Sequence, residues 1–313
     1  MRPVVSPQGQ PARSAQATRS GQSSATRHRG ESAARGQSGR TGHRLTVRRL
    51  SREAEDGFRS SLAPGLRSVA DAERLAEELA FAAARLELLC TQPPGAYAQV
   101  ADESRDPEER TWLAFLIAYL GPLDRERPFE EIERAWGPWA GGEPPALEGV
   151  VTGPRAAHDP ARGMRTIDAY RAWAQRSGSQ VAAFTGDQAW TPERRFARAF
   201  ERLALPGFER AARFDLLACL GRLGLYELEA GALALGGADP VTLAAKRVFG
   251  IGDTILLERR AAELARACGL PLEALDLALF NWERGERFGG GFDPAIEPAP
   301  ELLDGARTAL SLG

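Results

Sequence analysis

The amino-acid sequence predicts an all-α protein, and three observations favour this fold class. From residue 68 onward, apolar side chains recur with helical spacing, and helix-capping and helix-ending residues flank these stretches. After residue 60 there is almost no strand-like alternation. We expect two helical lobes, preceded by a disordered basic tail.

Residues 1–60 are built mainly from Ser, Gly, Gln, Ala, Thr and Arg, a composition that predicts disorder. Their formal charge is +8, whereas residues 61–313 carry −10. Such a tail could make salt-sensitive, sequence-independent contact with nucleic acid. An inert extension and an upstream-start artefact are the alternatives. The tail lacks the apolar core of a secretory signal.

The N-terminal helical region is predicted to span residues 61–142 and to hold three helices. The first covers 68–91, with Ser68 as its cap and an apolar stripe along one face. The second covers 107–120, with Pro107 in the first turn and an almost wholly apolar centre. The third, shorter helix is expected over 129–139.

A Gly- and Pro-rich loop at 143–164 is expected to separate the two lobes. It is locally basic, which suits phosphate contact, although solvated arginines explain it equally well; its basic residues are Arg155, His158, Arg162 and Arg165. The second helical region is predicted over 165–288, and residues 289–313 form a C-terminal tail.

The second region contains a helix–hairpin–helix pattern. Helices are predicted over 166–176 and 191–203, the latter opened by Thr191-Pro192-Glu193. A tight Pro206-Gly207 turn follows, and a second apolar stripe then continues to about residue 223. A glycine turn before a helix can direct backbone N–H groups at an anion.

The three cysteines are widely separated and only His158 lies outside the tail, so we expect reduced thiols, no metal site and no cofactor. No apolar run is long enough to cross a membrane, and we expect a cytoplasmic protein.

Lys246 is the only lysine of the chain, and Asp253 follows it by seven residues. A lysine ammonium is a compact, rotatable donor to phosphate and, unlike a guanidinium, it can lose its proton and act as a nucleophile. Asp253 stands where a new helix begins, so it is either a catalytic carboxylate or a helix cap. For Lys246, drift or an ordinary surface role is the alternative.

The segments LALPGF, FDLLACLGRLGLY, AAKRVFGIGD and LDLALFNWE resemble the alpha-glutamyl/putrescinyl thymine pyrophosphorylase group of the DNA glycosylase-like superfamily over roughly 150–285. The resemblance implies a helix-hairpin-helix fold and an activated hydroxymethyluracil in DNA. Pyrophosphate would be displaced from this base by an amino acid or polyamine. It implies a catalytic role for Asp253 and a phosphate contact from the hairpin at Gly207. From the residues themselves, we expect Arg210 and Arg213 to hold the same phosphate, and Lys246 and Arg247 to stabilise the departing pyrophosphate in the catalytic step. Trp282 and Tyr226 are candidates for stacking on the base.

The hairpin departs from the family pattern in two respects. Glu209 occupies the place of the usual second glycine, and Ala211 and Ala212 occupy the region of the glycosylase lysine. Residues 225–243 are expected to be an insertion. Excision through a Schiff base is therefore disfavoured, and the acidic body opposes nucleic-acid binding unless its charges are segregated.

One stretch does concentrate positive charge: residues 193–222 hold seven arginines against four acids. A DNA glycosylase, a non-catalytic DNA-binding module and an all-helical protein-interaction domain remain alternatives to a base-modifying enzyme.

Overall fold

A computed structural model describes residues 55–313, so most of the predicted tail lies outside the described residues. Leu50–Gly313 form one unit, in which the described residues contain helices and no strand. The all-α prediction is confirmed. The helices are α1 (Val69–Thr91), α2 (Gly95–Ala101), α3 (Pro107–Leu120), α4 (Glu130–Ala135), η1 (Pro160–Arg162), α5 (Arg165–Arg176), α6 (Gln180–Thr185), α7 (Pro192–Arg202), α8 (Arg210–Arg222), α9 (Pro240–Phe249), α10 (Thr254–Ala267), α11 (Leu272–Arg284) and α12 (Pro300–Ala309).

Local signals position most of these helices as the sequence predicts. The Ser68 hydroxyl accepts the Asp71 N–H at 3.2 Å and begins α1. Asp106 caps α3 in the same way, and Thr191 caps α7. The helix predicted over 129–139 ends early, at Ala135. Pro138 disfavours helical geometry at Gly137, which explains the early stop.

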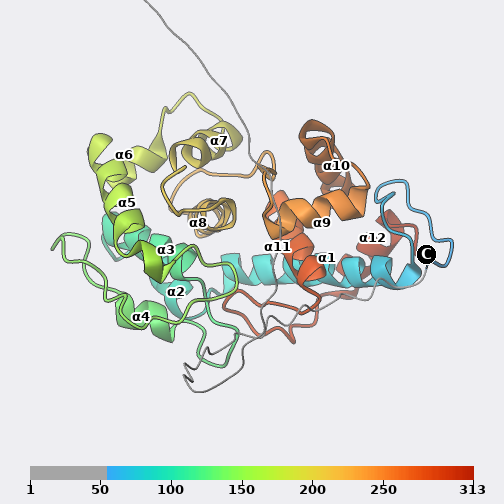
Figure 1. The fold of residues 1–313 in the computed structure, drawn as a ribbon, viewed down its shortest axis with the longest axis horizontal. Helices are drawn as coiled ribbons and strands as arrows, with labels where there is room; N and C mark the ends of the chain where they lie inside the picture. Colours follow the sequence, from blue (N-terminus) through green and yellow to red (C-terminus); the bar gives the residue numbers. More distant parts are fainter. Residues whose placement is uncertain (1–54) are drawn as a thin grey trace, which may run out of the picture. The chain divides into compact units, whose positions relative to one another are not determined.

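The long helix α1 lies against both groups of helices in Figure 1. Helices α9 to α12 gather near its N-terminal half, and α2 to α8 lie toward its C-terminal end. Helix α11 packs on α1 and α9, and α8 packs on α3. Residues 289–313, expected as a tail, include α12, which packs on α1 through an ion pair of Arg307 with Glu73 at 2.8 Å.

Helix α3 forms the centre of the second group, because its residues from Arg110 to Leu120 are all buried. Its aromatic face stacks on a neighbouring helix, with the rings of Phe115 and Tyr170 3.8 Å apart. Phe208, which follows the predicted hairpin, packs on the same Phe115 at 5.1 Å. The hairpin is therefore attached to the core by its own aromatic residue.

Every helix of residues 55–313 is too short or too polar to cross a bilayer. Within the same residues, no group of three or more His, Cys, Asp or Glu side chains is arranged to hold a metal ion.

Candidate functional site

The predicted turn between α7 and α8 is present, and it is covered on one side. The Phe208 N–H donates to the Leu205 carbonyl at 3.0 Å, and Gly207 has φ +77°, a conformation that favours glycine. Thr166 donates its hydroxyl to the Pro206 carbonyl at 2.8 Å. A side chain on Gly207 would begin 2.6 Å from Nη1 of Arg162. Gly207 is thus buried beneath Arg162 and Thr166.

Arg210, a predicted phosphate ligand, is engaged within the protein. Its Nη2 lies 2.5 Å from Oδ1 of Asp276, and its Nε donates to the Leu233 carbonyl at 3.1 Å. Nη1 lies 3.7 Å from Oδ1 of Asp239 at the start of α9. The guanidinium therefore connects α8 to α9 and α11, and its contact with DNA phosphate stays a prediction.

Asp276 on α11 is the centre of a buried ion-pair network that also contains Arg155, Arg210 and Asp215. Arg155 Nη2 donates to Asp276 Oδ2 at 2.6 Å. The same guanidinium makes two hydrogen bonds of 2.7 Å to Asp215 on α8. The side chains of Arg155 and Asp276 are only 4% and 1% exposed, whereas that of Asp215 is 36% exposed. Hereafter these four residues are called the buried network.

Charge complementarity holds this network in its ionised form. Burial raises the pKa of Asp276, but the guanidiniums of Arg210 and Arg155 more than offset this and keep its pKa below the ordinary aspartate value. Burial likewise opposes the charge of Arg155, and Asp215 and Asp276 raise its pKa above the ordinary value. The Nη1 atom of Arg155 is buried and has no hydrogen-bond partner among the described residues.

Two cavities adjoin Arg155. The first, of about 60 Å³, lies where α1, α3, α8 and α11 meet, and Arg85, Tyr97, Asp215 and Cys219 contribute to its wall. It exceeds the minimum of about 10–15 Å³ that a single water requires, so it can hold at least one water. Arg85 binds the Gly289 and Gly290 carbonyls at 3.2 and 2.9 Å and so holds the C-terminal loop against α1.

The second cavity, of about 400 Å³, lies between the hairpin and α9. Glu209 and Ala211 line it from the start of α8, and Asp239 and Pro240 from the start of α9. Phe280 and Arg155 complete its wall, together with Pro154, Ala156 and Ala238. We call it the hairpin-side cavity.

The first turns of α8 and α9, two helices that begin 30 residues apart, therefore border one space. Helix N-termini carry free N–H groups and a partial positive charge. The carboxylates of Glu209 and Asp239 stand at the same helix starts, so acidic side chains border the cavity beside the positive ends of both helices.

Two aspartates begin helices near the C-terminal half of the chain, and they have different surroundings. Asp239 accepts the Val241 and Thr242 N–H groups at 3.1 and 3.3 Å and lines the hairpin-side cavity. Asp253 accepts the Leu256 N–H at 2.9 Å as the cap of α10 and is exposed. Among the described residues, no hydrogen bond or ion pair links Asp253 to the hairpin. Asp239 was not among the residues predicted from the sequence, and the catalytic role of Asp253 stays a prediction.

Lys246 lies in the last turn of α9 and is half-exposed, with no ion pair in the described part of the chain. In the first turn of α10, nine and ten residues after Lys246, two apolar side chains are exposed: Ile255 at 80% and Leu256 at 46%. The surface that carries Lys246 and Asp253 is thus open to solvent, as the prediction requires, but both roles stay predictions.

Arg247 and Trp282, predicted to contact phosphate and base, contact each other. The guanidinium lies 5.4 Å from the indole centroid and pairs with Glu283 at 2.8 Å. Arg74 lies over the same indole at 5.2 Å, and Trp282 Nε1 donates to the Asp71 carbonyl at 3.0 Å. Trp282 is only 4% exposed, so stacking on a base would require rearrangement of these contacts.

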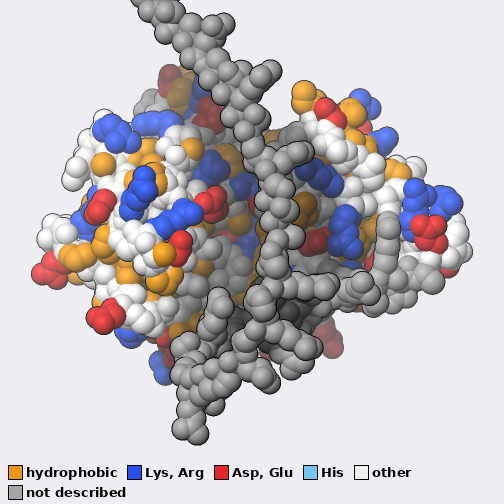
Figure 2. Space-filling view, viewed as in Figure 1, with side chains coloured by type: hydrophobic (Ala, Val, Ile, Leu, Met, Phe, Trp, Pro, Cys, Tyr) orange, Lys and Arg blue, Asp and Glu red, His pale blue; other side chains and the backbone are white. Residues whose placement is uncertain are grey.

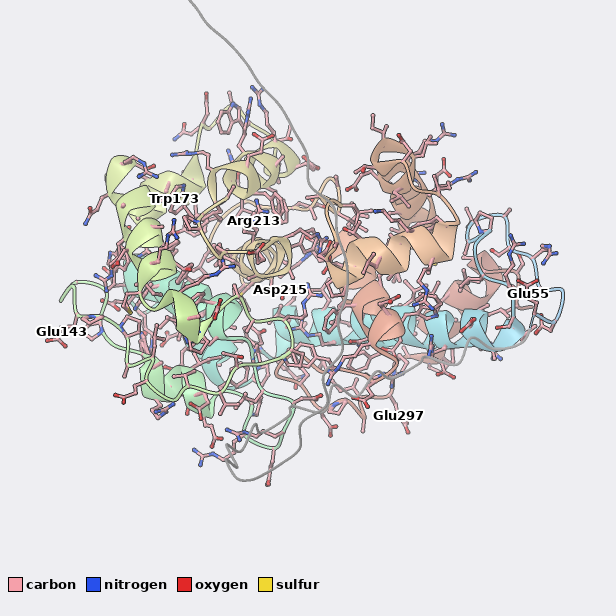
Figure 3. All side chains as sticks on the ribbon, in the orientation of Figure 1. Glu55, Glu143, Trp173, Arg213, Asp215 and Glu297 are labelled. Carbon is pink, nitrogen blue, oxygen red and sulfur yellow. The ribbon has the colours of Figure 1, made fainter. Side chains whose placement is uncertain are left out.

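Tyr226 and Arg213 occupy intermediate environments. The Tyr226 hydroxyl lies 2.6 Å from that of Thr111, and burial raises its pKa to about 12. Arg213 donates to the Phe200 carbonyl at 3.2 Å, and its pKa is lowered by burial. Residues two apart point to opposite sides of a helix, and Figure 3 shows Arg213 on the α7 side of α8 and Asp215 on the other side.

The buried network was not predicted as a site. The one feature of the sequence that could have revealed it is Asp276, an acidic residue within the apolar stretch LDLALFNWE of α11. A carboxylate at such a position requires a buried partner. The partner, Arg155, lies in the Gly/Pro-rich loop, where no periodicity reports burial.

One family model matches the chain over residues 155–289, and its description is alpha-glutamyl/putrescinyl thymine pyrophosphorylase clade 3. The match begins at Arg155 and includes the hairpin, the start of α9 and the whole of α11. It confirms the resemblance predicted from the sequence. No curated protein and no solved structure matches the chain.

Proposed function

We propose that this chain modifies a thymine-derived base in DNA by replacing pyrophosphate on its activated hydroxymethyl group with an amine. The family match over residues 155–289 supports the reaction class. The observation that carries the proposal is the hairpin-side cavity, where the matched segments converge on one space.

In the proposed step, the nitrogen of an amino acid or polyamine forms a bond to the methylene carbon attached to the base. The bond from that carbon to the pyrophosphate oxygen breaks, and pyrophosphate leaves with the bonding pair. The new ammonium then releases a proton to a carboxylate. The protein must therefore supply a proton acceptor and stabilise a departing anion.

We assign the proton acceptor to Asp239, because this carboxylate lines the hairpin-side cavity. Asp253, the residue predicted from sequence, is the alternative acceptor on the outer surface of α9 and α10. Lys246 and Arg247 are proposed to stabilise the departing pyrophosphate. The ammonium of Lys246 is the better suited, since Arg247 already has Glu283 as a partner.

The proposed DNA contacts are the hairpin around Gly207 with Arg210 and Arg213, and the proposed base contacts are Trp282 and Tyr226. Their protein partners restrict these roles. Arg210 and Trp282 are buried, so we expect their substitution to reduce stability before it affects chemistry. Arg213 and Tyr226 are half-exposed and give cleaner tests.

The test uses the full chain and a duplex that contains 5-hydroxymethyluracil pyrophosphate, with glutamate, glycine or putrescine as the amine. We expect pyrophosphate release that requires both the DNA and one amine, together with the matching mass increase of the nucleoside. Base loss that leaves an abasic site would instead identify a glycosylase. Binding without chemistry would identify a DNA-binding module, and the absence of both would overturn the DNA function.

Asp239→Asn and Asp253→Asn form a matched pair of variants, because asparagine caps helices about as well as aspartate. If Asp239 is the acceptor, its variant should lose at least about 100-fold in rate, as expected for loss of a general base. Asp253→Asn should then retain nearly full activity. The opposite pattern would return the role to Asp253.

A further inference from the structure

The seven arginines of residues 193–222 separate into two classes in the structure. Three of them pair with acids and are buried or partly buried: Arg195 with Glu227, Arg210 with Asp276, and Arg222 with Glu273. Arg213 is half-buried against Phe200. The three that remain, Arg194, Arg198 and Arg202, are exposed on α7.

These three arginines follow one another at intervals of four residues, so they share one face of α7. With a rise of 1.5 Å per residue, their backbone positions span about 12 Å. Aromatic rings hold the two outer guanidiniums: Arg194 lies 5.2 Å from the Trp190 centroid and Arg202 lies 5.9 Å from that of Trp173. Stacking orders a guanidinium and leaves N–H groups in its plane free to bind an anion.

Helix α5 extends this basic face. Arg165 and Arg176 are exposed and eleven residues apart, a spacing that returns to the same side of a helix. Neither has an ion pair among the described residues. Arg202 donates to the Ser177 hydroxyl at 2.7 Å, which connects the end of α7 to the end of α5. In Figure 2, blue side chains gather over the part of the visible face formed by α5, α6 and α7.

The sign of the charge on these two helix faces is opposite to that of the body. Helices α5 and α7 together carry these five exposed arginines and three exposed acids, namely Asp168, Glu193 and Glu201. By contrast, the formal charge of residues 61–313 as a whole is −10. Of these arginines, only Arg198 has a carboxylate partner among the described residues, Glu201 at 2.9 Å. A local excess of unpaired guanidiniums favours a polyanionic partner.

We infer that Arg165, Arg176, Arg194, Arg198 and Arg202, which we call the α5–α7 arginine surface, bind the sugar-phosphate backbone of DNA. The inference rests on the proposed function, in which DNA carries the substrate. One DNA strand has a phosphate every 3.4 Å of helix axis, so the 12 Å span of α7 faces about three to four phosphates. Such contacts position the duplex without reading its sequence.

The test is fluorescence anisotropy of the full chain with a short duplex between 50 and 200 mM salt. The variant Arg194→Gln/Arg198→Gln/Arg202→Gln removes the three α7 charges. The matched control, Arg125→Gln/Arg127→Gln/Arg134→Gln, removes three exposed arginines near α4 and so changes the net charge equally. Residues 1–54 are the same in all three proteins.

Each phosphate contact contributes about 0.9 to the slope of log affinity against log salt. We expect the α7 variant to lose about two to three units of slope and at least tenfold in affinity at 100 mM salt. The control should change affinity less than twofold. Circular dichroism melting curves would verify that both variants are folded.

Failure of the proposed function and failure of this inference alone would give different binding results. If the wild-type chain does not bind DNA, both this inference and the proposed function are overturned. If it binds DNA and the α7 variant behaves like the control, the proposed function stands and the α5–α7 arginine surface does not bind the backbone.

Discussion

The guanidinium of Arg155 and the carboxylate of Asp276 form a 2.6 Å ion pair in the interior, although 121 residues separate them in the chain. The pair connects the loop before α5 to α11, and Arg155 extends the connection to Asp215 on α8. Both cavities of the candidate site adjoin Arg155. The geometry of the site therefore depends on this ion pair, and its removal should be detectable as a loss of stability.

Asp276→Asn should lower the free energy of unfolding by about 3–5 kcal/mol, because it leaves two buried guanidiniums without their shared carboxylate. Chemical denaturation followed by circular dichroism measures this. Arg127→Gln is the control, since that side chain is 74% exposed in its pair with Glu130, and it should change stability by less than about 0.5 kcal/mol. A loss below about 1 kcal/mol for Asp276→Asn would contradict the structural role.

The same carboxylate should make stability depend on pH in the acid range. The pKa of Asp276 is lower in the folded protein than in the unfolded chain, so its contribution is complete above the ordinary aspartate value of about 4. The contribution is lost as the pH falls through the folded-state pKa. Denaturation curves between pH 2.5 and 6 should show a steeper acid decline for the wild type than for Asp276→Asn. Parallel curves would exclude a lowered pKa.

Cys90 should be the first of the three thiols to react with a disulfide reagent in the native protein. Burial raises the pKa of all three thiols, that of Cys219 to about 12 and that of Cys268 to about 11, but only Cys90 is exposed to the reagent. Cys90→Ser should abolish the fast phase of a thiol titration. A persistent fast phase would mean that a second cysteine is accessible.

Gly207→Ala should destabilise the protein more than Gly224→Ala. Both glycines have left-handed backbones, with φ of +77° and +73°, so each substitution adds about 1–2 kcal/mol of backbone strain. At Gly224 a methyl group meets nothing within 4 Å, whereas at Gly207 it collides with Arg162 and Thr166. Thermal or chemical denaturation of the two variants isolates the collision. Equal losses would show that the covering residues move aside freely.

The sequence by itself determined the helical class, the boundaries of α1, α3, α5 and α7 to within one residue, and the turn at Gly207. These features depend on interactions within a few residues: periodic apolar side chains, caps such as Ser68 and Thr191, and glycine where φ is positive. It also identified the family resemblance, which depends on short segments such as AAKRVFGIGD.

Only the tertiary structure decided which of these residues remain free to bind a ligand. Arg194 and Arg210 both lie near the start of a predicted helix, and the sequence does not distinguish them. In the structure Arg194 is exposed on α7, whereas Arg210 is buried against Asp276. Trp282 is enclosed by Arg74 and Arg247, and Asp239 rather than Asp253 borders the hairpin-side cavity. Periodicity reports that one face of a helix is buried. The partner on that face depends on contacts between distant segments, which local patterns do not encode.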